Sequence, residues 1–556
     1  MKAKLNIVTL VVFSIIGTTQ YVGAQDSGLD SLKGTHTGAY KPTIADAIKI
    51  SETPEIVDST KKIQVPEYNI KSTKIKTNFT PEPIVPAQIA GDPLEKLYNS
   101  LVKLGIGTYN TPYGELWVNK LRSKNSAGGV RLKHLSSTFT QKGYGYAGFN
   151  DDEISVYGKK FLRKHSLIGS ADYFRNTVHL YGYNTDLFSL KRSDTEQRFN
   201  YIAAKAKLQS HYKDKKLINH LAGINYYTFT DRWNGVENNV NVYGFAKKNI
   251  ADGVARIDAN VNYTNYRNLL DTVNNTIISI RPNWTITDSS YTAKLGFDIT
   301  HDVFNTTTAY LYPNVYFSYK VIDDIIVPYA GFSGGLYKNS FRSLTDINPF
   351  VNSALAMNNT SENYVAYGGI KGNLSRTTSF NAKVSTNSIN DMALFVNDTT
   401  GFNNRFDVIY DDAKVFTFHG EAGYQLREKI RVNLAAIYYS YSMETELRAW
   451  HKPQVHITLS GNYNLQNKII AKLAVYYVGA QFAKEYETDS NNPALLTTIE
   501  NELDGYIDIN ISGEYRYTKK LGFFLNLNNL TNSAYKKFNN YPTQQFSVMG
   551  GLSYSF

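Results

Sequence analysis

Residues that could do chemistry are few in this chain and stand far apart. Asp151-Asp152-Glu153 could bind calcium, because clustered carboxylates supply hard oxygen ligands, although three adjacent acids on a loop are more often simply solvated. Trp233, in a loop at residues 231–235, could stack on a sugar or another ligand, or it could serve as a packing cap. The sequence has no nucleophile elbow, phosphate-binding loop or recognisable pair of catalytic acids. We therefore expect no enzyme and no cofactor.

The histidines and the basic residues also outline no clear site. The ten histidines are dispersed without metal-ligand spacing, so we expect no metal centre, and His456 is most simply a polar wall residue. The formal net charge is +11, but the basic residues form no dense run, which argues against nucleic-acid binding. Basic turns could dock an acidic partner or lipid phosphates, although ordinary solvated turns explain them more simply. These turns are Arg163-Lys164-His165, Lys213-Asp214-Lys215-Lys216, Arg427-Glu428-Lys429 and Lys519-Lys520.

The elements that must hold these residues are strands with two unlike faces. In the last strand, mostly large apolar residues alternate with small and polar ones, and the chain stops on an aromatic residue. In a soluble sheet the apolar face would pack on a core, but this pattern recurs beyond what one core could absorb, so lipid is the expected solvent. One face is Phe546, Val548, Gly550, Leu552, Tyr554 and Phe556, and the other is Ser547, Met549, Gly551, Ser553 and Ser555.

Inner segments repeat the alternation and carry charged or amide groups on the polar face. Such groups would be costly in lipid and suit a water-filled lumen. The 43 Tyr and 28 Phe, against 4 Trp and 5 Met, fit the interfacial girdles of a membrane barrel. A secreted, aromatic-rich sandwich or solenoid is the alternative, but no fixed-length repeat is visible. The clearest segments are residues 255–264, 454–463 and 507–516.

Ten short polar breaks divide the chain into strand pairs. Consecutive breaks are roughly 35 to 54 residues apart, which leaves room for two spanning strands of ~10 residues and a longer loop. Ten hairpins and one strand at each end predict about 22 strands, an even number typical of single-chain bacterial barrels. Residues 388–412 are hard to segment, and we expect the longest outer loops at residues 338–362, 484–500 and 531–543. The breaks lie near Asn125, Lys164, Asp214, Asp252, Asp288, Asp323, Thr377, Glu428, Gln466 and Lys519.

The N-terminal residues differ from the rest of the chain. A basic start, an apolar run and small residues before Gln25 predict a secretory signal peptide over residues 1–24. Residues 25–97 contain seven prolines and show weak periodicity, so we expect a short periplasmic or luminal segment there. The barrel is expected over residues 98–556. The chain has no cysteine, so no disulfide supports this exported protein.

The C-terminal residues resemble the closing hairpin of TonB-dependent outer-membrane receptors. Residues 526–532 read Asn-Leu-Asn-Asn-Leu-Thr-Asn, and Tyr541-Pro542 and a strand ending on Phe556 follow. The family has an Asn-Leu-x-Asn-x-x-Tyr-like element at this place. The family usually has Gly-Arg where this chain has Thr543-Gln544-Gln545, and residues 25–97 are well short of its plug domain and carry no convincing energy-coupling box. The matching positions are Asn529, Leu530, Asn532 and Tyr535.

The resemblance implies an all-β fold, a transmembrane antiparallel barrel in the outer membrane of a Gram-negative cell. It also implies a receptor-like barrel that transports or passes a nutrient, with a reduced or absent plug. The alternative is a plugless scaffold barrel in a multi-protein outer-membrane assembly. An open barrel of this size would leave a wide aqueous hole, so we expect the lumen to be filled by residues 25–97, by inward-folded loops or by another protein.

The expected partners follow from the membrane location. The barrel would contact outer-membrane lipid, including lipopolysaccharide, and it could bind a periplasmic or outer-membrane protein, but no nucleic acid. Its aromatic end, Phe556 with Tyr554, would serve as the recognition element for the barrel-assembly machinery, as it does in outer-membrane proteins generally.

Overall fold

The computed structural model describes residues 98–556, apart from residues 121–122, 305, 323, 400 and 489–495. The predicted signal peptide and the proline-rich segment, residues 1–24 and 25–97, lie outside the described residues. In the described part, none of the helices has the length and apolar character needed to span a membrane. Strands make up most of the described chain.

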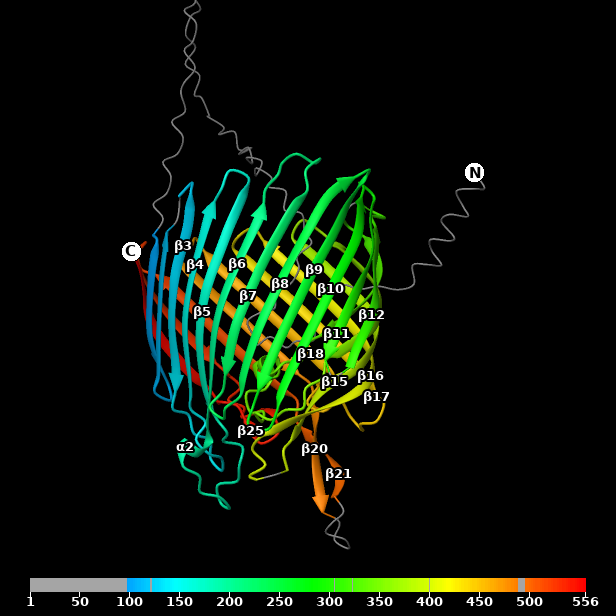
Figure 1. Cartoon of the computed structure of the whole chain (residues 1–556). Helices are drawn as coiled ribbons and strands as arrows, with labels where there is room; N and C mark the ends of the chain where they lie inside the picture. Colours follow the sequence, from blue (N-terminus) through cyan, green and yellow to red (C-terminus); the bar gives the residue numbers. More distant parts are fainter. Residues whose placement is uncertain (1–97, 121–122, 305, 323, 400, 489–495) are drawn as a thin grey trace, which may run out of the picture. The chain divides into compact units, whose positions relative to one another are not determined.

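Twenty-two strands form one antiparallel sheet that closes on itself (Figure 1). The first, β1 (Ser100–Gly107), pairs with the last, β26 (Ser547–Ser555), so the red end of the chain lies beside the blue end in Figure 1. Closure leaves no unpaired sheet edge. The other barrel strands are β2 (Thr111–Lys120), β3 (Ser126–Ser137), β4 (Phe149–Phe161), β5 (His165–His179), β6 (Glu196–Ser210), β7 (Asn219–Thr230), β8 (Val236–Ile250), β9 (Gly253–Arg267), β10 (Thr272–Thr287), β11 (Tyr291–Phe304), β12 (Thr306–Tyr319), β13 (Val327–Tyr337), β14 (Thr360–Asn373), β15 (Thr378–Asn397), β16 (Phe406–Leu426), β17 (Ile430–Met443), β18 (Val455–Leu465), β19 (Ile469–Val478), β22 (Tyr506–Arg516) and β23 (Leu521–Asn528).

Short turns gather at one end of the barrel and longer connections at the other. All ten predicted breaks fall in sequence between two consecutive barrel strands, and they define the short-turn end. The opposite, long-loop end carries the three predicted long loops. The predicted barrel of about 22 strands is therefore confirmed, with ten hairpins at the short-turn end and one further strand at each end of the chain. Small elements of the long-loop end are α2 (Arg192–Thr195), α3 (Phe341–Ile347) and the hairpins β20 (Gln481–Thr488)–β21 (Leu496–Leu503) and β24 (Lys536–Phe538)–β25 (Tyr541–Pro542).

The two faces of the strands differ as the alternation predicts. On β26, Leu552 and Tyr554 are 40% and 41% exposed on the outside, whereas the side chain between them belongs to Ser553, which is 6% exposed. On β9, Ile257 faces outward, and its neighbours Arg256 and Asp258 form an ion pair on the inner face (Nη2–Oδ1, 2.5 Å). The barrel thus has an apolar exterior suited to lipid and a polar lumen.

The seam between the first and last strands depends on small residues. The backbone N–H of Ser100 donates to the carbonyl oxygen of Phe556 (3.1 Å), and the N–H of Phe556 donates back (3.0 Å). A Cβ atom added at Gly551 would lie 2.4 Å from the ring of Phe524, which packs across this glycine. The small face of the last strand therefore leaves room for an inward-pointing ring at the seam.

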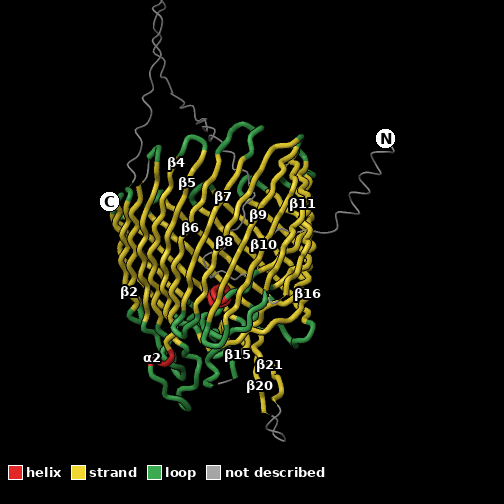
Figure 2. The backbone as a smooth tube through the Cα atoms, viewed as in Figure 1, coloured by secondary structure: helices red, strands yellow, loops and turns green. Residues whose placement is uncertain are grey.

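The largest cluster of buried hydrophobic residues lies inside the barrel rather than between layers of sheet. Figure 2 shows a short helix inside the space that the barrel wall encloses. Of the described helices, α3 is the one whose residues belong to this cluster. The cluster joins strand residues near the long-loop end to residues of the connections themselves. These connections fold inward and occupy the mouth of the lumen.

Candidate functional site: the loop lid

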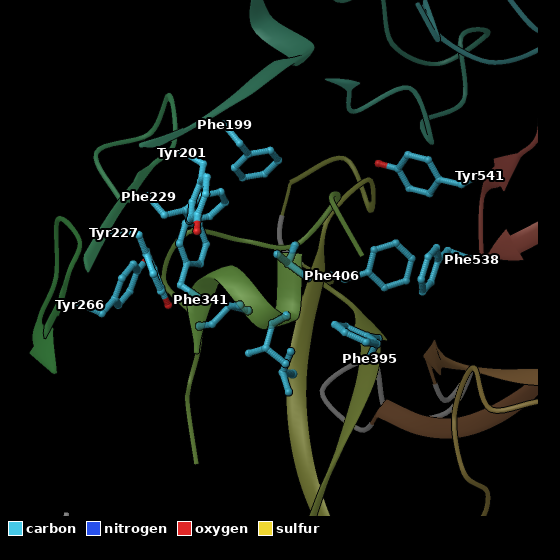
Figure 3. Packing of buried hydrophobic residues seen from close by; sticks show 14 of the residues in the cluster. Phe199, Tyr201, Tyr227, Phe229, Tyr266, Phe341, Phe395, Phe406, Phe538 and Tyr541 are labelled. Carbon is cyan, nitrogen blue, oxygen red and sulfur yellow. The ribbon is translucent and has the colours of Figure 1, made fainter. Parts of the chain in front are cut away.

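Four connections of the long-loop end meet inside the barrel, and we call them together the loop lid. They are residues 338–359, which contain α3, and residues 398–405, 444–454 and 529–546. Figure 3 shows their aromatic centre, with Phe341 on the helix and one group of rings on the barrel wall. A second group lies at the ends of β15 and β16 and on the short hairpin β24–β25; it consists of Phe395, Phe406, Phe538 and Tyr541. One of the three candidates for filling the lumen, inward-folded loops, is therefore observed.

Helix α3 packs on the wall through Phe341, whose side chain is fully buried. Its ring centroid lies 5.6 Å from that of Phe229 and 4.8 Å from that of Tyr266. The helix begins after Ser340, whose hydroxyl accepts a hydrogen bond from the Ser343 N–H and so satisfies a free amide at the helix start. The cap and the buried ring together fix where this connection crosses the lumen.

Charged residues beside Phe341 strengthen the same contact. The guanidinium of Arg342 lies over the rings of Tyr201 and Tyr227, 4.1 and 4.9 Å from their centroids. The backbone N–H of Arg342 donates to Glu237 Oε2 (3.0 Å), and the Tyr227 hydroxyl donates to Glu237 Oε1 (2.6 Å). Glu237 is fully buried, so these donors offset the cost of removing a carboxylate from water.

Lys338, just before α3, makes a third contact with the wall. Its ammonium donates to Asn262 Oδ1 (3.0 Å) and Thr264 Oγ1 (2.9 Å). Burial lowers the pKa of Lys338 to about 8, and the nearby Glu237 partly opposes that shift. The start of the connection is therefore held by an aromatic, a cation–π and a polar contact at once.

The end of the same connection is joined to two other loops. The ring of Phe350 stacks on Tyr541 with centroids 3.7 Å apart, and the Tyr541 hydroxyl donates to the carbonyl oxygen of Asn404. Val351 forms a bridge with Phe406, in which the N–H of Phe406 donates to the Phe350 oxygen (3.0 Å). Loops far apart in sequence thus close against one another across the mouth.

A buried histidine joins the remaining loop to this assembly. His451 Nδ1 lies 3.0 Å from the carbonyl oxygen of Phe395, and the N–H of Asn539 donates to His451 Nε2 (3.2 Å). The ring is therefore neutral, with its proton on Nδ1. Burial lowers the pKa of His451 to about 4. Protonation would place a second N–H against the Asn539 N–H, so this contact requires the neutral ring.

The acidic triplet does not form the calcium site that its three adjacent carboxylates could have provided. Asp151, Asp152 and Glu153 lie within strand β4 rather than on a loop, so adjacent side chains point to opposite faces. Asp152 pairs with His134 on the outer face (2.7 Å), whereas Glu153 pairs with Arg131 on the inner face. Among the residues that the structure describes, no group of three or more His, Asp or Glu side chains is placed to hold a metal ion.

Trp233 and His456 lie where the sequence places them. Trp233 lies in the loop between β7 and β8, and His456 lies on the barrel wall. The Arg405 guanidinium lies 4.9 Å from the centre of the Trp233 ring, so this tryptophan contacts residue 405 of the lid. The His456 ring lies on the luminal face of β18, 6.1 Å from that of Tyr439. The basic turns lie at the short-turn end, and docking of a partner there stays a prediction.

The residues of the family-like motif form a compact turn after β23. The Asn529 side-chain amide donates to the carbonyl oxygens of Ser533 (2.8 Å) and Gln544 (2.9 Å), and Asn529 has a left-handed φ of 49°. Leu530 N–H donates to the oxygen of Ile509 (2.9 Å) on the neighbouring strand. Asn532 Oδ1 accepts from the Phe546 N–H (3.2 Å) at the start of the last strand.

Tyr535 completes this turn by joining it to β22. Its ring stacks on Tyr506 with centroids 3.7 Å apart, and its hydroxyl donates to Asp508 Oδ2 (3.1 Å). The four motif residues therefore hold the last loop against the wall and direct the chain into β26. The proposed assembly role of Phe556 and Tyr554 stays a prediction; their rings lie 6.2 Å apart on the outer face.

The lid residues were missed at the sequence level, although a signal for them exists. Phe199 and Tyr201 on β6, and Tyr227 and Phe229 on β7, occupy the polar face of strands whose other face meets lipid. Aromatic residues on the luminal face near the long-loop end indicate that something apolar packs there. No comparable signal marks Phe341, which lies in a connection without clear periodicity.

Together, the closed 22-strand sheet, the apolar exterior and the filled mouth define a class of protein. The fold is that of the large outer-membrane β-barrels of Gram-negative bacteria. No protein-family model matches the sequence, and no curated protein sequence matches it.

Solved structures of TonB-dependent receptors share the fold. The FrpB iron transporter from Neisseria meningitidis has a TM-score of 0.64 at 10% identity, over 83% of this chain and 82% of its own. The ferripyoverdine receptor of the Pseudomonas aeruginosa outer membrane has a TM-score of 0.61 at 13% identity, over 83% and 72%. The ferric-catecholate import receptor Fiu from E. coli gives 0.58 at 12% identity, over 83% and 82%. The chain thus resembles these receptors in fold.

Proposed function

We propose that this chain passes a nutrient across the outer membrane and that the loop lid is the gate at the outer mouth. The observation that carries the proposal is the lid itself, in which several connections leave the rim and enter the lumen, pack on the wall through Phe341 and are joined to one another through Tyr541. Long loops lie on the outer side of single-chain bacterial barrels, which places the lid toward the surroundings of the cell.

The chemistry of the lid suits a gate better than a permanent seal. The loops are joined by ring stacking and single hydrogen bonds between different connections, and the described chain has no disulfide across them. Each such contact contributes about 1 kcal/mol, so a bound solute could displace the set stepwise. The similar solved structures include an iron transporter and an import receptor, which supports passage of a solute as the function.

The test is solute uptake by liposomes that contain the purified full-length chain. If the chain transports a solute, liposomes that contain it should take up at least one class of small solute faster than empty liposomes do. The barrel should also purify alone from mild detergent. The opposite result is a barrel that passes no solute and purifies with a stoichiometric protein partner. That outcome would refute transport and would support the scaffold alternative.

A further inference from the structure

The outer surface of the barrel is hollowed beside the seam, across strands β1 to β5. The hollow has a volume of about 530 Å³ and opens outward, toward the region that lipid occupies. One cross-strand row runs through it at the level where the apolar band ends toward the long-loop end. The row consists of Leu104, Gly114, His134, Asp152 and Arg175, each paired with the next across neighbouring strands.

The neighbouring row toward the membrane centre is entirely apolar or aromatic. Leu132 and Ile154 are 38% and 45% exposed on the outer face, although they lie in the middle of their strands. This row lines the floor of the same hollow. Its members are Val102, Leu116, Leu132, Ile154 and Tyr173.

A glycine creates the depth of the hollow. A Cβ atom added at Gly114 would meet only Leu104, 3.9 Å away, so the space in front of this backbone is open. The residues on either side, Leu104 and His134, carry full side chains that form the walls. A narrow trough between side chains suits a flexible hydrocarbon chain.

Polar groups at the outer end of the hollow suit an anion. Both carboxylate oxygens of Asp152 already have hydrogen-bond partners, because His134 Nδ1 lies 2.7 Å from Oδ1 and the Asn150 amide donates to Oδ2 (3.2 Å). Arg175 differs, since its Nε is buried and has no hydrogen-bond partner among the described residues. Because this Nε is buried and the side chain as a whole is only half-buried, a ligand would be met by the rest of the guanidinium, and an arginine at the membrane interface is a typical ligand of phosphate.

We propose that this hollow binds a phosphate-bearing, acylated lipid of the outer leaflet, with an acyl chain in the trough at Gly114 and against the apolar row, and a phosphate on Arg175. We assign the outer leaflet because the row that contains His134, Asp152 and Arg175 lies toward the long-loop end of the barrel. The site lies on the outer surface of the barrel, so it is distinct from the proposed transport through the lumen and does not depend on it.

The experiment measures lipid binding to the detergent-purified full-length chain by native mass spectrometry. The probes are bis-phosphorylated, hexa-acylated lipid A and, separately, phosphatidylethanolamine. We expect lipid A to bind more tightly, and Arg175→Gln to weaken it about tenfold or more through loss of a charge-assisted hydrogen bond. Gly114→Leu should weaken it similarly by filling the trough.

Matched controls lie on the same outer face of β4, at its short-turn end. Gly158→Leu adds a side chain in open space, because a Cβ there meets nothing within 4 Å, and Lys160→Gln removes a cation. Both should bind lipid A like the unaltered chain. Unchanged binding by Arg175→Gln and Gly114→Leu would overturn the proposal, and so would equal weakening by the controls or equal affinity for phosphatidylethanolamine. Heat-modifiability of each variant verifies that its barrel is folded.

Discussion

Replacing Phe341 with alanine should open the lid while leaving the barrel intact. The ring is fully buried and lies against Phe229 and Tyr266, with centroids 5.6 and 4.8 Å away. Truncation of a buried Phe costs about 3–5 kcal/mol, and the lower figure suits a loop that can partly collapse. Since each 1.4 kcal/mol is a factor of ten, the open population should rise about a hundredfold.

Hydrogen exchange followed by mass spectrometry measures this opening directly. Amides of α3 report it, because the Leu344 N–H donates to Ser340 (3.0 Å) and the Asn348 N–H donates to Leu344 (2.9 Å) only while the helix is formed. We expect their exchange to accelerate about a hundredfold and the exchange of the barrel strands to stay unchanged. Phe523→Ala is the control, because it removes the same ring from the lipid-facing surface, where Phe523 is 47% exposed. Unchanged exchange in α3, or equal acceleration in the strands, would show that Phe341 does not specifically hold the lid closed.

Three further predictions concern the lid and the end of the chain. The pKa of His451 falls from an ordinary 6.5 to about 4 in the closed lid, so the open form binds more protons between these values and acidification favours opening. The lid should lose about 1.4 kcal/mol at pH 5.5 relative to pH 7.5, seen as a roughly tenfold lower protection of the amides near residue 451 relative to their intrinsic exchange rate at each pH, and His451→Gln should abolish this pH dependence of the protection. Tyr541→Phe leaves the buried Asn404 carbonyl without its hydroxyl donor and should weaken the lid by about 1–3 kcal/mol; no change in exchange around residues 398–405 would contradict it. Deletion of Phe556 removes the backbone pairing with Ser100 and should reduce the amount of heat-modifiable barrel in the membrane, whereas normal accumulation would exclude an assembly role.

The barrel could be predicted from the sequence because lipid imposes a strict period of two on every strand. Residues such as Ile257 and Leu552 meet lipid, their neighbours meet the lumen, and the polar turns between strands carry no such pattern. The stretch 388–412 resisted segmentation for a physical reason. Strands β15 and β16 extend past the barrel rim there, their register shifts between Ile389 and Met392, and Asp391 has a left-handed φ of 56°. The alternation is therefore broken at the point where the strands leave the membrane.

The lid could not be predicted in the same way. Its contacts join residues far apart in sequence, such as Phe341 with Phe229 and Tyr541 with Asn404, and no local period specifies them. The acidic triplet was expected on a loop but lies in strand β4. Adjacent acids suggested one site, but their placement in β4 sends Asp152 outward and Glu153 inward. Knowing the strand boundaries would have excluded that site from the sequence alone.

A reversible lock across the lid tests the gate most directly. Because the chain has no cysteine, Val351→Cys with Phe406→Cys can form one disulfide between the bridged loops, and Ser279→Cys with Thr300→Cys provides a control pair within the wall. The measurement is solute flux into liposomes before and after reduction. A gating lid predicts that solute flux through the variant with the lid pair is blocked when the pair is oxidised and restored by reductant, while flux through the variant with the wall pair is the same in both states. Equal flux through the oxidised and reduced lid pair would contradict it.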